Sequence, residues 1–282
     1  IFSSAGVSKL RITGGEPLVR ANLPDLIFKL SAIEGIDDIA LTTNGYLLAQ
    51  NAQAMMDAGL DRLTISLDSI DEDIFKKMSG RPQGPANTLE GIKVATKIGF
   101  SSVKINVVVQ RGVNDHTLVD TARYFKGSGA IVRFIEFMDV GTKNGWELSQ
   151  VVPSKEVIDL IGEEFPLEPI DPNYVGEVAS RYRYLDGDGE IGVISSVSEP
   201  FCGNCTRARL STDGKLVTCL FASGGTDLKT PLRAGASELE LAEIIGRVWT
   251  GRGDRYSELR SKATEFKAGS PDDKVEMYYI GG

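Results

Sequence analysis

The chain has 282 residues, of which 41% are hydrophobic and 25% are charged, as is typical of a folded globular protein. Its 31 Lys and Arg residues face 39 Asp and Glu residues, and the formal net charge of -8 argues against a nucleic-acid partner bound through overall charge. No apolar run is long enough to span a membrane and the first residues lack a signal-peptide pattern, so we expect a cytoplasmic protein without a membrane partner.

The first 140 residues alternate short β-branched runs with longer segments of helical periodicity. This pattern predicts strands over residues 9–13, 39–43, 62–68, 103–110 and 131–138, and helices over residues 23–33, 49–58, 87–98 and 116–126. Strands that are connected by helices run parallel, and their near-continuous apolar character indicates that both faces are covered. The candidates are therefore an α/β barrel or an open doubly wound sheet.

Polar residues at the ends of these strands favour the barrel. They are Thr13-Gly14-Gly15-Glu16-Pro17 and Thr42-Thr43-Asn44-Gly45 after the first two strands, then Ser66 with Asp68, Lys104 with Asn106, and Arg133 with Glu136. In a barrel such positions converge on one mouth, where active sites of this architecture lie. In an open sheet they would be spread along an edge.

Beyond about residue 141 the pattern changes. The sequence predicts one helix over residues 154–164, a hairpin that joins 182–185 to 191–194, a second hairpin around Asp213-Gly214, and a late helix over 239–249. We therefore expect an α/β unit over residues 1–140 and a C-terminal region with antiparallel character over residues 141–282.

All three cysteines lie close together in the sequence, as Cys202-Gly-Asn-Cys205 and Cys219. Three thiols cannot all pair, and a cytoplasmic protein seldom forms disulfides, so the cluster points to a metal. Structural zinc requires a fourth ligand, which a carboxylate or water could provide, because the single histidine, His116, lies far upstream. An iron–sulfur cluster held by three cysteines would leave one iron open to a substrate. The spacing alone leaves both metals open.

The hairpin between Cys205 and Cys219 determines what surrounds these sulfurs. If residues 212–214 form its loop, Ser211 pairs with Lys215, and Cys219 lies opposite Arg207 and on the same face as Arg209. A two-residue loop at Asp213-Gly214 would put the arginines on the other face. We predict the first register. Two guanidinium groups beside a metal cluster would suit a planar anionic ligand.

Together, the Gly14-Gly15-Glu16-Pro17 turn, the Thr42-Thr43-Asn44-Gly45 turn and the Cys202, Cys205 and Cys219 set resemble the GTP 3',8-cyclase family. These are radical S-adenosylmethionine lyases of molybdenum cofactor biosynthesis. The resemblance covers the whole chain and implies a partial, TIM-like parallel α/β barrel with a C-terminal antiparallel extension. It also implies S-adenosylmethionine and two 4Fe-4S clusters as cofactors. A 5'-deoxyadenosyl radical would convert GTP to 3',8-cyclo-7,8-dihydro-GTP. A homodimer and a downstream partner enzyme, cyclic pyranopterin monophosphate synthase, are expected from the same resemblance.

The resemblance also implies roles for individual residues. S-adenosylmethionine would contact Gly15, Glu16, Ser66, Asn106, Arg133 and Met138, with Gly15 receiving its amino group through the backbone and Glu16 shaping the turn. GTP would contact Lys9, Arg11, Thr42, Lys104, Arg207 and Arg209. Cys202, Cys205 and Cys219 would hold the second cluster, and the tail Gly281-Gly282 would enter the active site. No Walker-type loop is present, so separate basic side chains must bind the triphosphate.

One family feature is missing from the printed sequence. The CxxxCxxC motif for the first cluster should precede Ile1, so we expect the chain as given to bind no first cluster and to generate no radical. Two other functions remain as alternatives. Lys104 on an apolar barrel strand could serve a Schiff-base aldolase, or the cysteines could bind zinc in a non-enzymatic binding module.

Overall fold

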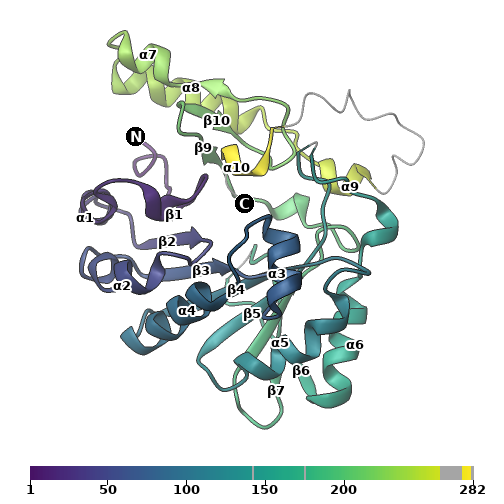
Figure 1. The fold of residues 1–282 in the computed structure, drawn as a ribbon. Helices are drawn as coiled ribbons and strands as arrows, with labels where there is room; N and C mark the ends of the chain where they lie inside the picture. The colour runs from purple at the N-terminus through teal and green to yellow at the C-terminus, as the bar shows by residue number, and fades with distance from the viewer. Residues whose placement is uncertain (142, 175, 261–274, 281–282) are drawn as a thin grey trace.

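The computed structural model describes residues 1–141, 143–174, 176–260 and 275–280. Its main element is an eight-stranded sheet in the order β1-β2-β3-β4-β5-β8-β7-β6. The strands are β1 (Lys9–Ile12), β2 (Asp38–Thr43), β3 (Arg62–Ser66), β4 (Ser102–Val109), β5 (Ala130–Glu136), β6 (Leu167–Ile170), β7 (Ser180–Tyr184) and β8 (Glu190–Ile194). The first five strands and β8 pair in parallel, whereas β7 runs antiparallel to both β8 and β6. Among the described residues β1 and β6 form the two edges, so the sheet is a partial barrel (Figure 1).

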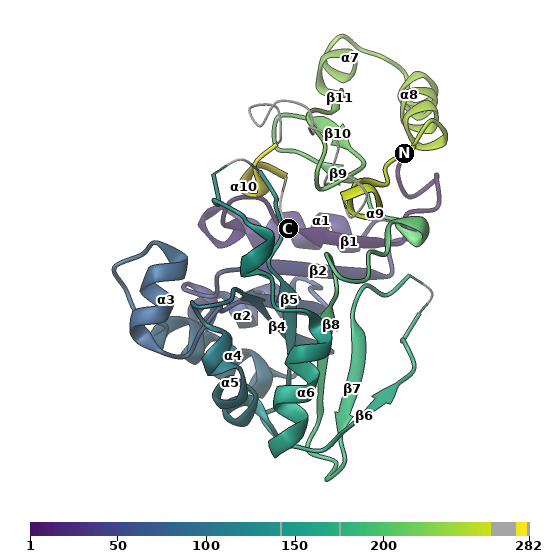
Figure 2. The ribbon, with the colours of Figure 1, turned by 90° about the vertical axis from the view of Figure 1, so that its right-hand side faces the viewer.

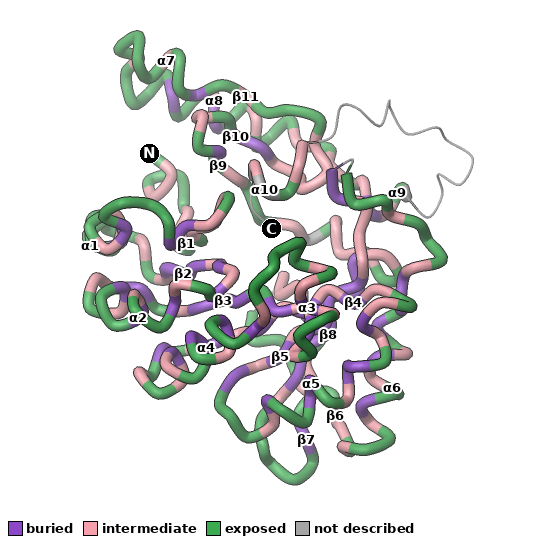
Figure 3. The backbone as a smooth tube through the Cα atoms, in the orientation of Figure 1, coloured by how far each residue is buried: buried purple, intermediate pink, exposed green. Residues whose placement is uncertain are grey.

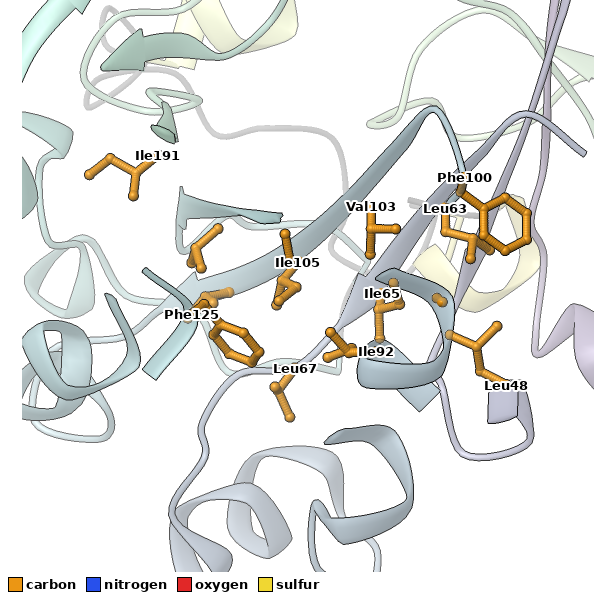
Figure 4. Close-up of a cluster of buried hydrophobic side chains, with 14 of the residues drawn as sticks. Leu48, Leu63, Ile65, Leu67, Ile92, Phe100, Val103, Ile105, Phe125 and Ile191 are labelled. Carbon is orange, nitrogen blue, oxygen red and sulfur yellow. The ribbon is translucent and has the colours of Figure 1, made fainter. Parts of the chain in front are cut away.

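The connecting helices cover the outer face of this sheet. They are α1 (Leu23–Ser31), α2 (Leu48–Asp57), α3 (Glu72–Ser79), α4 (Ala86–Ile98), α5 (Leu118–Phe125) and α6 (Ser154–Glu164). Leu48 of α2 and Ile92 of α4 are buried in one cluster with Leu63, Ile65 and Ile105 of the sheet (Figure 4). Burial of such side chains is the main favourable term in folding, at about 1.5–3 kcal/mol each. The apolar core therefore lies on one face of the sheet and leaves the other face for chemistry.

The predicted parallel unit is confirmed, because all five expected strands and all four expected helices of the first 140 residues are present. Helix α3 is an addition that the periodicity did not predict. It begins at Asp71, whose carboxylate accepts hydrogen bonds from the backbone N–H groups of Asp73 and Ile74. Within it only Phe75 is buried. Its apolar residues, Ile74, Phe75 and Met78, are too few for the segment to stand out as a helix in the sequence.

The predicted hairpin over residues 182–194 is also confirmed, as the antiparallel pair β7 and β8. It belongs to the main sheet, because β8 continues it in parallel beside β5 with Val132 opposite Ile191. Residues on both sides of the boundary expected at residue 140 thus form one sheet. The sequence pattern did not predict β6, which pairs with β7 at the outer edge.

A smaller C-terminal unit lies beside the β1 edge (Figures 1 and 2). It contains β9 (Arg209–Leu210), β10 (Lys215–Val217), β11 (Thr226–Asp227), α7 (Lys229–Arg233), α8 (Glu238–Thr250), α9 (Tyr256–Arg260) and α10 (Met277–Ile280). Phe2 packs against Leu216, Leu228 and Ile245 of this unit, so the start of the chain joins it to the barrel. Within the described residues no helix has the length and apolar character that a membrane crossing requires.

The hairpin of this unit has the predicted register. The backbone N–H of Ser211 donates to the carbonyl of Lys215 at 2.9 Å, and Leu216 pairs with Leu210. Gly214 has a φ of +86°, the left-handed conformation that the expected loop requires. The ladder ends at Arg209 and Val217, so the pairing of Cys219 with Arg207 stays a prediction.

Candidate active site on the inner face of the sheet

The inner face of the partial barrel is polar. Side chains alternate along each strand, so the outward residues are apolar while the inward ones include Arg11, Thr42, Thr64, Lys104, Asn106 and Arg133. The strand register aligns Thr42 with Thr64 and Thr64 with Lys104, and it aligns Ser66 with Asn106 and Asn106 with Arg133. Buried residues alternate with partly buried ones along β4 and much of β5, and Figure 3 colours the two classes differently along the chain. Six of the twelve residues expected to contact the two small molecules therefore lie on one surface, namely Arg11, Thr42, Ser66, Lys104, Asn106 and Arg133.

Arg11 is held at one end of this surface by two hydroxyl groups. Its Nη1 donates to Oγ1 of Thr42 and to Oγ1 of Thr64, both at 3.0 Å. Burial lowers the pKa of Arg11, and the positive charge of Arg62 lowers it further. Neutral hydroxyls orient the guanidinium without cancelling its charge, so it remains available to an anion.

Arg133 and Lys104 form the centre of the same surface. Arg133 donates to Oδ1 of Asn106 from Nε at 3.0 Å and from Nη2 at 2.7 Å. Burial lowers the pKa of Lys104 to about 8, and the charge of Arg133 is the next cause. Burial also lowers the pKa of Arg133 to about 10, with Arg11 as the next cause. The three cations are thus crowded on one face, an arrangement that a bound anion would stabilise.

Part of the positive charge on this face is neutralised within the protein. Arg62 pairs with Asp38 and Arg181 pairs with Glu190. Lys9 instead lies over the ring of Tyr174, with Nζ at 4.2 Å from the ring centroid. No carboxylate is recorded in an ion pair with Arg11, Lys104 or Arg133 within the described residues. Thr64 and Tyr174 were not predicted as site residues from the sequence, because neither belongs to a recognisable motif.

The turn after β1 is built around Glu16. Its Oε1 accepts from the backbone N–H of Leu18 at 3.0 Å and from the hydroxyl of Thr43 at 2.6 Å, and its Oε2 accepts from the backbone N–H of Asn44 at 2.8 Å. Both carboxylate oxygens thus bind protein groups, which fits the expectation that Glu16 shapes the turn. A Cβ added to Gly15 would have no heavy atom within 4 Å, so the backbone there is open to a ligand.

The remaining expected contacts lie at the same end of the strands. Ser66 ends β3 and is exposed, and Met138 follows β5 and packs against Ile135 and Ile194. Nearby, Asp68 accepts a hydrogen bond of 2.9 Å from the backbone N–H of Val108, and burial raises its pKa to about 6. A separate cavity of about 100 Å³, lined by Phe125, Tyr184 and Ile191 among others, lies at the opposite ends of β5 and β8, away from these groups.

The three cysteines are free thiols, and each is partly buried. Cys202 and Cys205 flank a single 3-10 turn, and Cys219 follows β10. Burial would raise the pKa of Cys205, but hydrogen bonds from Arg207 and the charge of that residue outweigh it and lower the pKa to about 7. The Nε of Arg207 donates to Sγ of Cys205 at 3.2 Å. Burial raises the pKa of Cys219. Among the smaller causes, the charge of Cys202 raises this pKa and the charge of Arg209 lowers it.

In the described part of the chain, the three thiols share one neighbourhood without forming a compact group of metal ligands. Among the residues that the structure describes, no three cysteine, histidine or carboxylate side chains are grouped so as to hold one metal ion. Electrostatic coupling nevertheless connects Arg209 with both Cys205 and Cys219, so the three sulfurs share one neighbourhood. The expected tail Gly281-Gly282 lies outside the described residues.

Two family models match successive parts of the chain. Residues 2–125 match the Radical SAM superfamily, and residues 130–258 match the family Molybdenum Cofactor Synthesis C. The structure of Streptococcus suis SuiB aligns with a TM-score of 0.56 at 13% identity, covering 98% of this chain and 68% of that one, which supports the fold alone. Fold and superfamily together define the chain as a radical S-adenosylmethionine enzyme.

The sequence relatives narrow this class. A GTP 3',8-cyclase of Xanthomonas axonopodis pv. citri is 52% identical over 281 residues, which cover 100% of this chain and 82% of that protein. A GTP 3',8-cyclase of Staphylococcus saprophyticus is 47% identical over 283 residues, again with 100% and 82% coverage. The chain belongs to the GTP 3',8-cyclase family of molybdenum cofactor biosynthesis.

Proposed function

We propose that this chain supplies the cofactor and substrate sites for conversion of GTP to 3',8-cyclo-7,8-dihydro-GTP. The observation that carries the proposal is the convergence of Arg11, Lys104 and Arg133 on the inner face, with the three cysteines in the adjoining C-terminal unit. S-adenosylmethionine and two 4Fe-4S clusters, when bound, supply the 5'-deoxyadenosyl radical and an open iron. The chain's own residues bind and orient the two small molecules.

The cofactor side of the site comprises the turn after β1 and the ends of β3 to β5. The open backbone at Gly15 would receive the amino group of S-adenosylmethionine, in a turn held in shape by Glu16. Arg133 and Asn106 are already hydrogen bonded and would present their remaining polar atoms together. Ser66 and Met138 are proposed as further contacts, on the basis of their place beside these residues.

The substrate side comprises the cations of β1 and β4. Lys9, Arg11 and Lys104 would bind the triphosphate, and Thr42 orients Arg11 through its hydroxyl. Binding a multiply charged anion removes the mutual repulsion that lowers the pKa of Lys104. Triphosphate binding is therefore favoured by the same crowding of charge that is unfavourable in the free protein.

The C-terminal unit would bind the guanine end of GTP. Cys202, Cys205 and Cys219 would ligate a 4Fe-4S cluster through three irons, and Arg207 and Arg209 would line the pocket of the guanine base. The product would pass to cyclic pyranopterin monophosphate synthase. A homodimer is proposed from the family alone.

Two other functions are less well supported. A Schiff-base aldolase is favoured only by the lowered pKa of Lys104, which burial and the charge of Arg133 explain without a carbonyl substrate. A zinc-bound module would use the same thiols but leaves the cations of the inner face without a role. Family membership favours the cyclase over both.

Anaerobic reconstitution tests the proposal directly. The chain should take up iron and sulfide in equal amounts and turn brown, and Cys219→Ser should reduce iron uptake while leaving the fold intact by circular dichroism. GTP should bind the reconstituted chain, and Lys104→Ala should weaken it about tenfold or more. Lys93→Ala, which removes an exposed lysine of α4, is the matched control. Stoichiometric zinc without iron, or equal GTP affinity for both lysine variants, would contradict the proposal.

A further inference from the structure

The segment that joins α8 to α9 contacts both the barrel and the cysteine loop, which we define as residues 202–205. It begins with Arg252 and continues through Asp254 to Tyr256, the first residue of α9. Helix α9 contacts the short turn that contains Cys202. None of these residues belongs to a motif that the sequence analysis singled out. Their contacts nonetheless lead to the two halves of the proposed active site.

The side chain of Arg252 binds the backbone of the cysteine loop. Its Nη1 donates to the carbonyl oxygen of Cys205 at 2.6 Å, and its Nε donates to Oδ2 of Asp254 at 3.1 Å. The guanidinium also stacks 5.0 Å from the ring centroid of Trp249, and only 12% of the side chain is exposed. With Nη1 and Nε both hydrogen bonded, the positive charge of Arg252 has a fixed place beside a proposed cluster ligand.

Tyr256 connects the same segment to the barrel. Its hydroxyl donates to Oδ2 of Asp139 at 2.5 Å, and Asp139 directly follows Met138 at the proposed cofactor site. The ring of Tyr256 stacks on Phe221 with centroids 4.5 Å apart and an interplanar angle of 19°. The backbone N–H of Phe221 points to Sγ of Cys219 at 3.5 Å. One tyrosine thus joins the end of β5 to the loop of the third cysteine.

We propose that Arg252 and Tyr256 are positioning residues that fix the C-terminal cluster relative to the cofactor end of the barrel. Arg252 fixes the backbone of Cys205 and adds a positive charge beside the cluster, whereas Tyr256 holds the Cys219 loop against Asp139. This inference rests on the proposed function, because it assigns the three cysteines to a cluster. A radical formed at one site must reach a substrate held at the other, so their separation has to be fixed.

The test compares Arg252→Ala, Arg252→Lys and Tyr256→Phe with a control, Arg247→Ala, which removes an exposed arginine from α8. Each variant of the 282-residue chain is reconstituted with iron and sulfide, and the midpoint potential of its cluster is measured by redox titration. Reduction adds negative charge, which a nearby cation stabilises. Arg252→Ala should therefore make the potential more negative, lowering the reduced-to-oxidised ratio at a fixed potential about tenfold. Arg252→Lys should recover part of the shift, and the control should show none.

A measurement without iron separates this inference from the proposed function. In the unreconstituted chain, amide hydrogen exchange of the peptide over residues 202–206 should accelerate in Arg252→Ala, and exchange over residues 137–141 and 219–222 should accelerate in Tyr256→Phe. If the wild-type chain binds no iron while these peptides respond as expected, the cluster assignment fails and the contacts stand as structural ones. If the wild-type chain binds its cluster but Arg252→Ala leaves both the potential and the exchange unchanged, the positioning role is wrong.

Discussion

The carboxylate of Glu16 accepts a hydrogen bond of 2.6 Å from the hydroxyl of Thr43, which joins the turn after β1 to the end of β2. The same carboxylate accepts from the backbone N–H of Asn44 through its other oxygen. Two of the three sequence features that carried the family resemblance, the turns after β1 and β2, are therefore joined in one structure. Glu16 acts within the protein, and the backbone of Gly15 is the part left open to a ligand.

Glu16→Gln should destabilise this pair of turns. The substitution keeps one acceptor oxygen but places an amide donor against a donor, leaving Thr43 or Asn44 without its partner. We expect a loss of about 1–3 kcal/mol in the free energy of unfolding, measured by urea denaturation. Glu34→Gln, at an exposed position after α1, should change it by less than about 0.5 kcal/mol. Equal stability of the two variants would show that the link between the turns is not needed.

GTP binding should weaken as the pH rises through about 8. The pKa of Lys104 is lowered to about 8, and a bound triphosphate favours the charged lysine, so binding takes up a proton above that pH. Between pH 8 and 9.5 the affinity should fall by up to about tenfold per pH unit. Lys104→Arg stays charged and should flatten this fall. The affinities are measured by calorimetry. Because the ionisation of GTP affects binding to both proteins equally, the difference between the two slopes reports on Lys104. Parallel slopes would exclude Lys104 from the site.

Glu136 is a buried carboxylate, 2% exposed, that organises the approach to the cysteine loop. It accepts from the backbone N–H groups of Ser154, Val197 and Ser198 at 2.8, 2.7 and 2.8 Å, and from the hydroxyls of both serines. Glu136→Gln places an amide donor against these donors and should cost roughly 2–4 kcal/mol of stability.

Because residues 197–198 lead into the turn at Cys202, the same variant should also take up less iron on reconstitution. Glu199→Gln removes an exposed carboxylate one residue beyond the contacts and is the control. Iron content by colorimetric assay and unfolding by urea should separate the two variants. A Glu136→Gln protein with full stability and full iron uptake would count against this role.

Two glycine substitutions in the C-terminal unit should act in opposite directions. A Cβ on Gly214 would lie 2.5 Å from Cβ of Lys229, at a backbone φ of +86°. Gly214→Ala should therefore lower the unfolding free energy by roughly 2 kcal/mol and loosen the hairpin that precedes Cys219. Gly246→Ala, inside α8 with no heavy atom within 4 Å, should raise it by about 0.5–1 kcal/mol. Thermal unfolding of both variants checks the sign, and a stabilising Gly214→Ala would mean that the loop has another conformation.

Local patterns predicted the parallel strands, their helices and the hairpin register because each depends on neighbouring residues. The loop over residues 212–214, for example, set the pairing of Ser211 with Lys215. Helix α3 escaped prediction because it has few apolar residues and buries only Phe75. Strand β6 escaped prediction because, among the described strands, it is held only by its pairing with β7.

The sequence by itself determined the family, the order of the parallel unit and the three thiols near its end, since all of these are written in residue types and spacings. Only the tertiary structure decided that the carboxylate of Glu16 is hydrogen bonded to Thr43 and Asn44. The same holds for the hydrogen bonds from Arg252 to Cys205 and from Tyr256 to Asp139. Tyr256 and Asp139 are 117 positions apart along the chain. Such contacts depend on how the strands and loops fold back on one another, and no local pattern of residues records them.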